Sequence, residues 1–209
     1  MSTTITENDI YSQLNRGFIE YYDDLVPKYL QDYYINLVKN KMEPVVGLEF
    51  FYSEDLSIED NQMGEFGFGC NIQDKDASFY HKSHYVISTP IHLLCKKLNL
   101  ALFDIYQVRS WIQTPQNHSN TFLPHQDLNH PHYVLLYYIN DSDGDTVFYD
   151  SDGITEIKRI TPKKGRVVFF DGSILHAASN PTTTPRIVFN YNFLAFSNES
   201  LKNIFPKYK

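Results

Sequence analysis

The spacing of apolar residues changes character about halfway along the 209-residue chain. In the first half, apolar side chains recur at helical spacing over residues 18–42. Pro27 fits the first turn of a helix but not its interior, so this stretch predicts two abutting helices. A further helix is predicted over residues 88–100, with Pro90 in its first turn. Residues 63–82 combine glycines with aromatic residues, and we predict a loop there with at most short strands.

Beyond residue 100 the pattern is typical of β-strands. Short segments rich in β-branched and aromatic residues alternate with turn sequences such as DSDGD, PKKG and NPTTTP. The predicted strands cover residues 104–113, 132–140, 145–150, 165–171 and 186–196. Regularly spaced short strands indicate a sandwich or jelly roll rather than a parallel α/β sheet. We therefore predict a mainly β fold in which the N-terminal helices cover one face of a sheet.

The composition fits a single globular domain of this kind. The chain contains 16 Tyr and 15 Phe, and this richness in aromatic residues favours strands over a helical bundle. The predicted organisation is a helical support region (residues 1–100), a β catalytic core (residues 101–197) and a C-terminal tail (residues 198–209). A net charge of -7 argues against a nucleic acid as the main partner, because phosphate binding usually needs a surplus of Lys and Arg.

The N-terminal residues lack a basic region followed by an apolar core, which is the pattern of a signal peptide. No apolar run approaches the ~18 residues needed to cross a bilayer. Cys70 and Cys95 are the only cysteines and have no zinc-site spacing, so two reduced thiols are expected. These features predict a cytoplasmic protein without a membrane partner.

Two pairs of histidine-containing positions are candidates for a metal site. In His125-x-Asp127 the imidazole and the carboxylate would share one face of a strand, although such a pair is also expected by chance in this chain. His130-x-His132 suggests a cupin-type site, but the next glutamate, Glu156, lies two turns downstream, too far for that motif. We therefore expect a structural or substrate-side role for His130 and His132.

The decisive residues lie further along the chain. His176 follows a predicted strand and turn, and Arg186 occurs ten positions later at the start of another strand. With His125 and Asp127, His176 completes a set of two histidines and one carboxylate, which leaves open coordination positions on non-haem Fe(II). The planar guanidinium of Arg186 is suited to binding a carboxylate through two hydrogen bonds.

The strand that begins at Arg186 has two different faces. Its polar face is predicted to contain Arg186, Val188, Asn190 and Asn192. Its opposite face is apolar or aromatic and contains Ile187, Phe189, Tyr191 and Phe193. Burying an arginine and two asparagines is costly in a plain core, so we expect the polar face to look into a functional cavity and the other face to pack against the helices.

These motifs resemble those of the 2-oxoglutarate/Fe(II)-dependent dioxygenases, in particular their prolyl 4-hydroxylase-like branch. The resemblance covers residues 101–197 and rests on HQD, YYIND, GDTVFYD, GRVVFFDGSILHA and the arginine ten positions after the second histidine. It does not extend to the first hundred residues. It implies a double-stranded β-helix, the cupin-like form of a jelly roll, buttressed by helices.

The resemblance also implies roles for individual residues. His125, Asp127 and His176 would bind Fe(II), and Arg186 would bind the distal carboxylate of 2-oxoglutarate. Further candidates for cosubstrate contact are Tyr138, Gln113, Trp111, Asn190 and Asn192. The implied reaction consumes O₂ and 2-oxoglutarate, hydroxylates a peptide (prolyl) or small-molecule substrate and releases CO₂ and succinate, with ascorbate as an additional candidate cofactor.

Two other functions are considered. A nucleic-acid dealkylase of the same superfamily would carry a second arginine shortly after Arg186, and the segment RIVFNYNF has none. A jelly-roll protein that binds metal without catalysis would keep the ligands but not turn over 2-oxoglutarate. The identity of the oxidised substrate depends on loops that the sequence pattern does not position.

Overall fold

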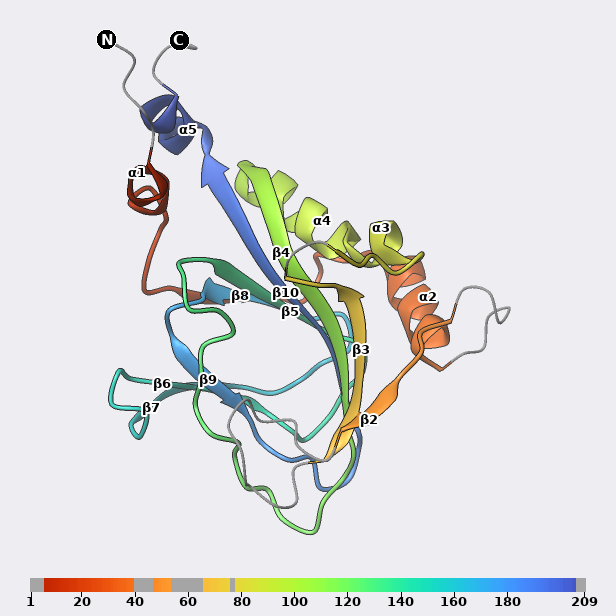
Figure 1. The fold of residues 1–209 in the computed structure, drawn as a ribbon. Helices are drawn as coiled ribbons and strands as arrows, with labels where there is room; N and C mark the ends of the chain where they lie inside the picture. The colour runs from red at the N-terminus through yellow and green to blue at the C-terminus, as the bar shows by residue number, and fades with distance from the viewer. Residues whose placement is uncertain (1–5, 40–46, 54–65, 76–77, 206–209) are drawn as a thin grey trace.

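The computed structural model describes residues 6–39, 47–53, 66–75 and 78–205. Two antiparallel sheets dominate it (Figure 1). The larger sheet has, in spatial order, β1 (Ile19–Tyr22), β8 (Val167–Asp171), β5 (Tyr133–Tyr138), β10 (Arg186–Ser197), β4 (Leu100–Gln113), β3 (Gly67–Gln73) and β2 (Phe51–Ser53). The smaller has β7 (Glu156–Ile160), β6 (Thr146–Tyr149) and β9 (Leu175–Ala178). The prediction of a mainly β, antiparallel fold is confirmed.

The inner faces of the two sheets share a small apolar core. This core combines residues of β5, β8 and β10 with residues of β6 and β7, and its members are Val134, Leu136, Tyr138, Phe148, Ile160, Val168, Phe170 and Val188. Alternate residues of β5 and β10 point to the opposite face, because successive side chains of a strand project in opposite directions. Two residues of this core, Leu136 and Val188, also line the cavity that is described below.

The outer face of the larger sheet is covered by α2 (Lys28–Val38), α3 (His84–Ile87) and α4 (Thr89–Leu98) (Figure 1). Tyr34 of α2 is fully buried and its ring lies 5.3 Å from that of Tyr137 and 5.5 Å from that of Phe189. The hydroxyl of Tyr191 donates a 2.6 Å hydrogen bond to the carbonyl of Ile87. The aromatic face of β10 thus packs on the helices, as its alternation predicts.

Short helices flank the ends of the chain. The N-terminal helix α1 (Glu7–Tyr11) and the C-terminal helix α5 (Asn198–Ile204) lie near one another beyond the end of β10 (Figure 1). α4 agrees with the helix predicted over residues 88–100 and ends at Asn99, which adopts the left-handed conformation (φ 53°). In the described part of the chain, no helix is long and apolar enough to cross a membrane.

The first of the two abutting helices is not formed. Residues 19–22 are strand β1, which pairs with the edge of β8 so that Ile19 lies opposite Phe170. This non-local pairing satisfies backbone groups of β8 that would otherwise be exposed at a sheet edge, and it overrides the local helical spacing. The second helix, α2, follows directly after Pro27, which is its N-cap.

The glycine-rich stretch forms more regular structure than predicted. Residues 67–73 are strand β3, antiparallel to β4, with Gly69 opposite Trp111. A side-chain carbon at Gly69 would lie only 2.6 Å from the Trp111 ring, so glycine is needed here for the ring to lie flat on the strand. Strands β7 and β9 of the smaller sheet were also not predicted. Strand β2, from the N-terminal half of the chain, adds a further strand to the larger sheet.

Candidate metal and cosubstrate site

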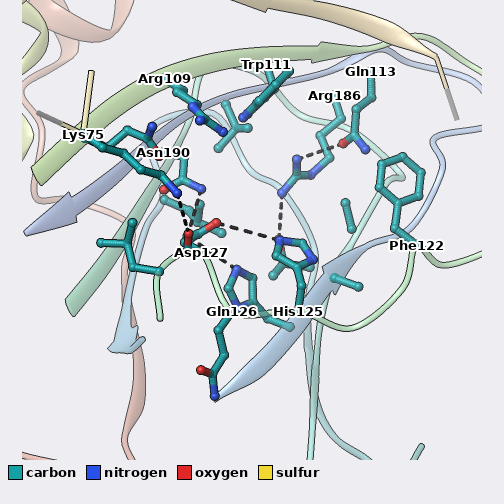
Figure 2. A pocket seen from close by; sticks show the side chains of 18 of the residues that line it. Lys75, Arg109, Trp111, Gln113, Phe122, His125, Gln126, Asp127, Arg186 and Asn190 are labelled. Carbon is teal, nitrogen blue, oxygen red and sulfur yellow. Dashed lines mark hydrogen bonds and ion pairs between the residues drawn. The ribbon is translucent and has the colours of Figure 1, made fainter. Parts of the chain in front are cut away.

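Strands β4 and β10 build one wall of a cavity of about 750 Å³ between the two sheets (Figure 2). In their antiparallel register Gln113 lies opposite Arg186, and Trp111 lies opposite Val188. Because side chains alternate along a strand, residues two apart on each strand project into the same cavity. Polar residues on these strands are therefore gathered along one wall, as the alternation of β10 predicts.

Three ligand-type side chains meet at this cavity. The ligating atoms of His125, Asp127 and His176 all lie within 4.8 Å of one another. His125 and Asp127 come from the segment between β4 and β5, whereas His176 lies on β9. Reciprocal backbone hydrogen bonds of 3.0 Å join His125 and His176, so the two histidines are held side by side by the main chain. The three predicted ligands are thus brought together.

The hydrogen bonds of the two imidazoles leave the correct nitrogen free for a metal. The Nδ1 of His125 lies 3.1 Å from the carbonyl oxygen of Leu123, and the Nδ1 of His176 lies 3.1 Å from that of Ile174. A carbonyl can only accept, so Nδ1 of each ring carries the proton and Nε2 keeps its lone pair. The two Nε2 atoms lie 3.8 Å and 3.7 Å from the Asp127 carboxylate oxygens, on either side of one shared position.

The electrostatics keep this donor set in the protonation state that a divalent metal requires. Burial lowers the pKa of His176 to about 4, so its imidazole is neutral at neutral pH. Burial alone would raise the pKa of the Asp127 carboxyl, but the neighbouring imidazoles and a hydrogen bond from Asn190 outweigh this effect and lower it. Neutral imidazole and ionised carboxylate are the forms that bind metal ions.

Arg186 lies on the wall formed by β4 and β10, at the end away from Asp127, and is 5 % exposed. Its Nη1 donates a 2.8 Å hydrogen bond to Gln113, and its Nη2 donates one of 2.8 Å to Thr146. The Nε of Arg186 is buried without a hydrogen-bond partner among the described residues. A buried guanidinium held by neutral groups is short of a negative charge, so a carboxylate ligand would complete it.

The remaining predicted residues take different places. Trp111 and Gln113 line the cavity, and Gln113 fixes the orientation of Arg186. Tyr138 is fully buried behind Arg186, with its hydroxyl 2.6 Å from that of Thr146. Asn190 lines the cavity and donates a 3.2 Å hydrogen bond to Asp127, so it orients a candidate metal ligand, and its contact with the cosubstrate stays a prediction.

Asn192 does not join the cavity wall. It is 2 % exposed, and its backbone pairs with Gln107 on one side and Val134 on the other. Its side-chain oxygen is buried without a hydrogen-bond partner among the described residues. Asn192 is not among the residues that line the cavity, and its contact with the cosubstrate stays a prediction.

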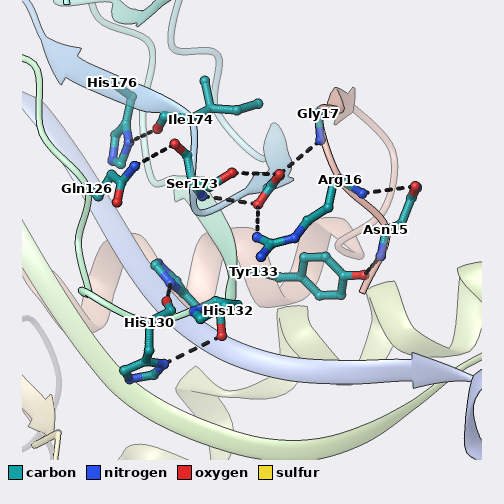
Figure 3. Close-up of polar contacts among 12 residues, drawn as sticks. Asn15, Arg16, Gly17, Gln126, His130, His132, Tyr133, Ser173, Ile174 and His176 are labelled. Atoms are coloured by element: carbon teal, nitrogen blue, oxygen red, sulfur yellow. Dashed lines mark hydrogen bonds and ion pairs between the residues drawn. The ribbon is translucent and has the colours of Figure 1, made fainter. Parts of the chain in front are cut away.

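His130 and His132 pack as structural residues beside the site (Figure 3). The ring of His130 lies 4.7 Å from Tyr106 and 6.2 Å from Tyr11. His132 is 1 % exposed, and its Nδ1 donates a 2.7 Å hydrogen bond to the backbone of His130. Neither lines the cavity, in agreement with the choice against a cupin-type metal site.

A network around Asp171 holds the turn that precedes His176 (Figure 3). Its carboxylate accepts hydrogen bonds from Arg16 (3.0 Å), from the backbone N–H of Gly17 (2.9 Å), and from the backbone N–H and hydroxyl of Ser173 (3.0 and 2.8 Å). Ile174, whose carbonyl orients His176, donates its own N–H to the Asp171 backbone at 3.0 Å. The N-terminal segment therefore supports the candidate metal ligand His176 indirectly, through the turn that precedes it.

Three further residues of the site escaped the sequence analysis. Thr146 bonds Arg186 across the two sheets, a contact that no local pattern encodes. Lys75 reaches the backbone carbonyl of Asp127 at 3.3 Å from a segment predicted only as loop. Arg109 lines the cavity together with Trp111 and Gln113, and its spacing of two residues from Trp111 could have indicated it.

Comparison with known proteins agrees with this geometry. Residues 110–194, which include all three candidate ligands and Arg186, match the family model of the 2OG-Fe(II) oxygenase superfamily. This segment of the chain is similar to the superfamily. No curated protein matches the chain in sequence. The donor set and the incompletely paired Arg186 described above fit Fe(II) and 2-oxoglutarate, the two groups that the name of this superfamily gives.

Several solved structures share the fold at low sequence identity. A viral collagen prolyl hydroxylase from Paramecium Bursaria Chlorella virus-1, in a 2OG complex, has a TM-score of 0.53 at 16% identity, covering 87% of this chain and 96% of that one. A prolyl hydroxylase from Trichoplax adhaerens, in complex with a hypoxia inducible factor peptide fragment, has a TM-score of 0.57 at 14% identity, covering 92% of this chain and 90% of that one. The epimerase SnoN from nogalamycin biosynthesis has a TM-score of 0.55 at 12% identity, covering 91% of this chain and 80% of that one. The predicted double-stranded β-helix is thus confirmed.

Proposed function

We propose that the protein is an Fe(II)- and 2-oxoglutarate-dependent dioxygenase that hydroxylates a peptide, such as a prolyl peptide, or a small molecule. The observation that carries this proposal is the convergence of His125, Asp127 and His176, whose ligating atoms lie within 4.8 Å of one another, with both Nε2 atoms within 3.8 Å of the Asp127 carboxylate. When bound, Fe(II) and 2-oxoglutarate supply the activation of O₂ that hydroxylates the substrate, with release of CO₂ and succinate.

Different residues of the chain would bind the metal and the cosubstrate. His125, Asp127 and His176 would hold the metal, and the carbonyls of Leu123 and Ile174 keep the two imidazoles in the required tautomer. Arg186, fixed by Gln113 and Thr146, would bind the distal carboxylate of 2-oxoglutarate. Because groups of the protein itself fix Arg186 and both imidazoles, little reorganisation is needed when the cosubstrate enters.

The fold relatives include a prolyl hydroxylase in complex with a peptide fragment and an epimerase from nogalamycin biosynthesis, and they support these two substrate classes. We therefore keep both a peptide and a small molecule in the proposal. A nucleic-acid substrate is disfavoured because the net charge is -7 and no arginine follows Arg186 on its strand. We also propose that the whole chain acts as one catalytic domain in the cytoplasm.

The test is an anaerobic titration of the protein with Fe(II) and then with 2-oxoglutarate, followed by the visible metal-to-ligand charge-transfer band. We expect one Fe(II) per chain, loss of that site in His176→Ala, and no change in the control variant His92→Ala, whose imidazole is exposed on α4. A thermal melt of each variant separates loss of the site from loss of the fold. Stoichiometric iron binding in His176→Ala would contradict the proposed ligand set.

Oxygen is then admitted and succinate is measured. Succinate formed without added substrate, and abolished in His176→Ala, supports a dioxygenase. A protein that binds Fe(II) and 2-oxoglutarate but forms no succinate with any peptide or small molecule offered would instead favour a metal-binding jelly roll without catalysis.

A further inference from the structure

We propose that Arg109, assisted by Lys75, binds an anionic group of the substrate, so that the protein acts on a carboxylate-bearing molecule. This inference rests on the proposed function, because it concerns what shares the cavity with the metal and 2-oxoglutarate. Arg109 lies on β4 opposite Asn190, four pairs along the register from the Gln113–Arg186 pair and on the same face (Figure 2). Since Asn190 in turn bonds Asp127, Arg109 lies at the metal-ligand end of the wall and Arg186 at the other end.

The chain contains five arginines, and their partners divide them into two groups. Arg16, Arg159 and Arg166 each pair with a carboxylate at 3.0 Å or less. Arg109 and Arg186 have no carboxylate within ion-pair distance among the described residues, and both line the same cavity. One of these two arginines is accounted for by 2-oxoglutarate, and the other is not.

The contacts of Arg109 are all neutral. In the amide orientation that satisfies both groups, the Gln107 oxygen accepts from Nε and Nη2 of Arg109 at 3.1 and 2.8 Å. The guanidinium carbon lies 5.8 Å from the centre of the Trp111 ring. Burial lowers the pKa of Arg109, and the more distant carboxylates of Asp127 and Asp74 offset this effect only in part. The side chain is held in place by neutral neighbours and lacks a close counter-ion.

The charges of the cavity wall support an anionic substrate. The lining residues include three permanent cations, Lys75, Arg109 and Arg186, against a single carboxylate, Asp127, in a protein that is acidic as a whole. Fe(II) adds two positive charges and 2-oxoglutarate adds two negative charges, so they cancel. The loaded cavity therefore keeps an excess of positive charge, which attracts an anion and raises its local concentration.

A second hollow indicates what the rest of this substrate looks like. It has a volume of about 480 Å³ and shares Arg109 and Trp111 with the first cavity. Aromatic side chains, including Phe51 and Phe79, line it on the β2–β3 side. A molecule whose carboxylate rests on Arg109 therefore has an aromatic surface next to it, which favours an organic acid with an apolar or aromatic group over a small, fully polar acid.

The experiment compares a carboxylate with its amide. Protein loaded with Zn(II), a redox-inert stand-in for Fe(II), and with saturating 2-oxoglutarate is titrated with phenylacetate and separately with phenylacetamide. Trp111 is the only tryptophan in the chain, so its fluorescence reports binding next to Arg109. We expect phenylacetate to bind at least about tenfold more tightly than phenylacetamide, as a charge-assisted hydrogen bond to a partly buried guanidinium would give.

Variants locate the preference. Arg109→Gln should remove the difference between acid and amide while leaving the 2-oxoglutarate affinity unchanged, and Arg109→Lys should retain part of it. Arg159→Gln, on the exposed strand β7, is the matched control and should behave as wild type. Equal affinity for the two probes, including no binding of either, would overturn the inference, as would a preference that survives in Arg109→Gln.

The same titrations separate this inference from the proposed function. If phenylacetate competes with 2-oxoglutarate, the acid occupies Arg186 and the assignment to Arg109 is wrong. If 2-oxoglutarate itself fails to bind the metal-loaded protein, the proposed function fails and this inference falls with it. If 2-oxoglutarate binds normally and the acid shows no preference, only the substrate-side site is refuted.

Discussion

Replacement of Arg186 by alanine removes the one buried cation that the structure offers to the distal carboxylate of 2-oxoglutarate. The guanidinium is 5 % exposed and is oriented by two hydrogen bonds of 2.8 Å, to Gln113 and Thr146. Removing one partner of a buried charge pair typically costs on the order of 2–5 kcal/mol, because the remaining charge is left without compensation. At about 1.4 kcal/mol for each factor of ten, 2-oxoglutarate should bind about 30-fold more weakly or worse.

The same substitution should leave metal binding nearly unchanged, because Arg186 lies at the opposite end of the wall from Asp127. It should also lower stability by about 1–3 kcal/mol, since the Gln113 oxygen would be left buried without its donor. Arg186→Lys keeps the charge but loses the two-pronged geometry, so its 2-oxoglutarate affinity should lie between those of the wild type and the alanine variant.

The assay is a titration of the anaerobic Fe(II) protein with 2-oxoglutarate, read from the charge-transfer absorbance, with a thermal melt of each variant as the folding control. An unchanged 2-oxoglutarate affinity in folded Arg186→Ala would refute the reasoning, because no described residue other than Arg186 offers a permanent cation at that end of the cavity. A parallel loss of iron affinity would show instead that the site has collapsed.

Three further outcomes are expected. Asn190→Ala should weaken Fe(II) binding by about 10- to 100-fold in a competition titration with a chelator, because the hydrogen bond that orients Asp127 is lost. Arg16→Ala should lower the melting temperature and weaken Fe(II) binding by a smaller factor, since Asp171 loses one of its donors; unchanged iron affinity would limit this residue to stability. The folded pKa of His176, about 4, lies below the ordinary value of 6.5, so metal-free protein should lose stability as pH falls from about 6.5 toward 4 in denaturant titrations, and His176→Gln should lose part of this dependence.

The sequence predicted those parts of the site that depend on local alternation. The faces of β10 follow directly from the period of two, and the ligands His125, Asp127 and His176 were selected by residue type and spacing. The same period relates Arg109 to Trp111 and Gln113 on β4, so Arg109 was within reach of this reasoning.

Parts that depend on contacts between distant segments could not be predicted in this way. Residues 19–22 have helical spacing, but they pair with β8, and the hydrogen bonds gained at the sheet edge decide their conformation. The contact between Thr146 and Arg186 depends on how the two sheets are placed relative to one another. Asn192 has the predicted face but is not among the cavity-lining residues, because alternation gives the direction of a side chain and not the extent of the cavity.

The reciprocal backbone hydrogen bonds between His125 and His176 have a consequence for how the protein opens. A metal held by both histidines would join two segments that are distant in sequence. One is the segment that leads into β5, and the other is strand β9. A bound ion adds a favourable term that grows with the logarithm of its concentration, and this term opposes every motion that separates the two segments. In metal-free protein a few backbone hydrogen bonds, including those between His125 and His176 and one from Phe122 to Ala178, resist that separation together with nearby packing. Loss of the metal should therefore speed amide exchange at this junction before it does so in the seven-stranded sheet.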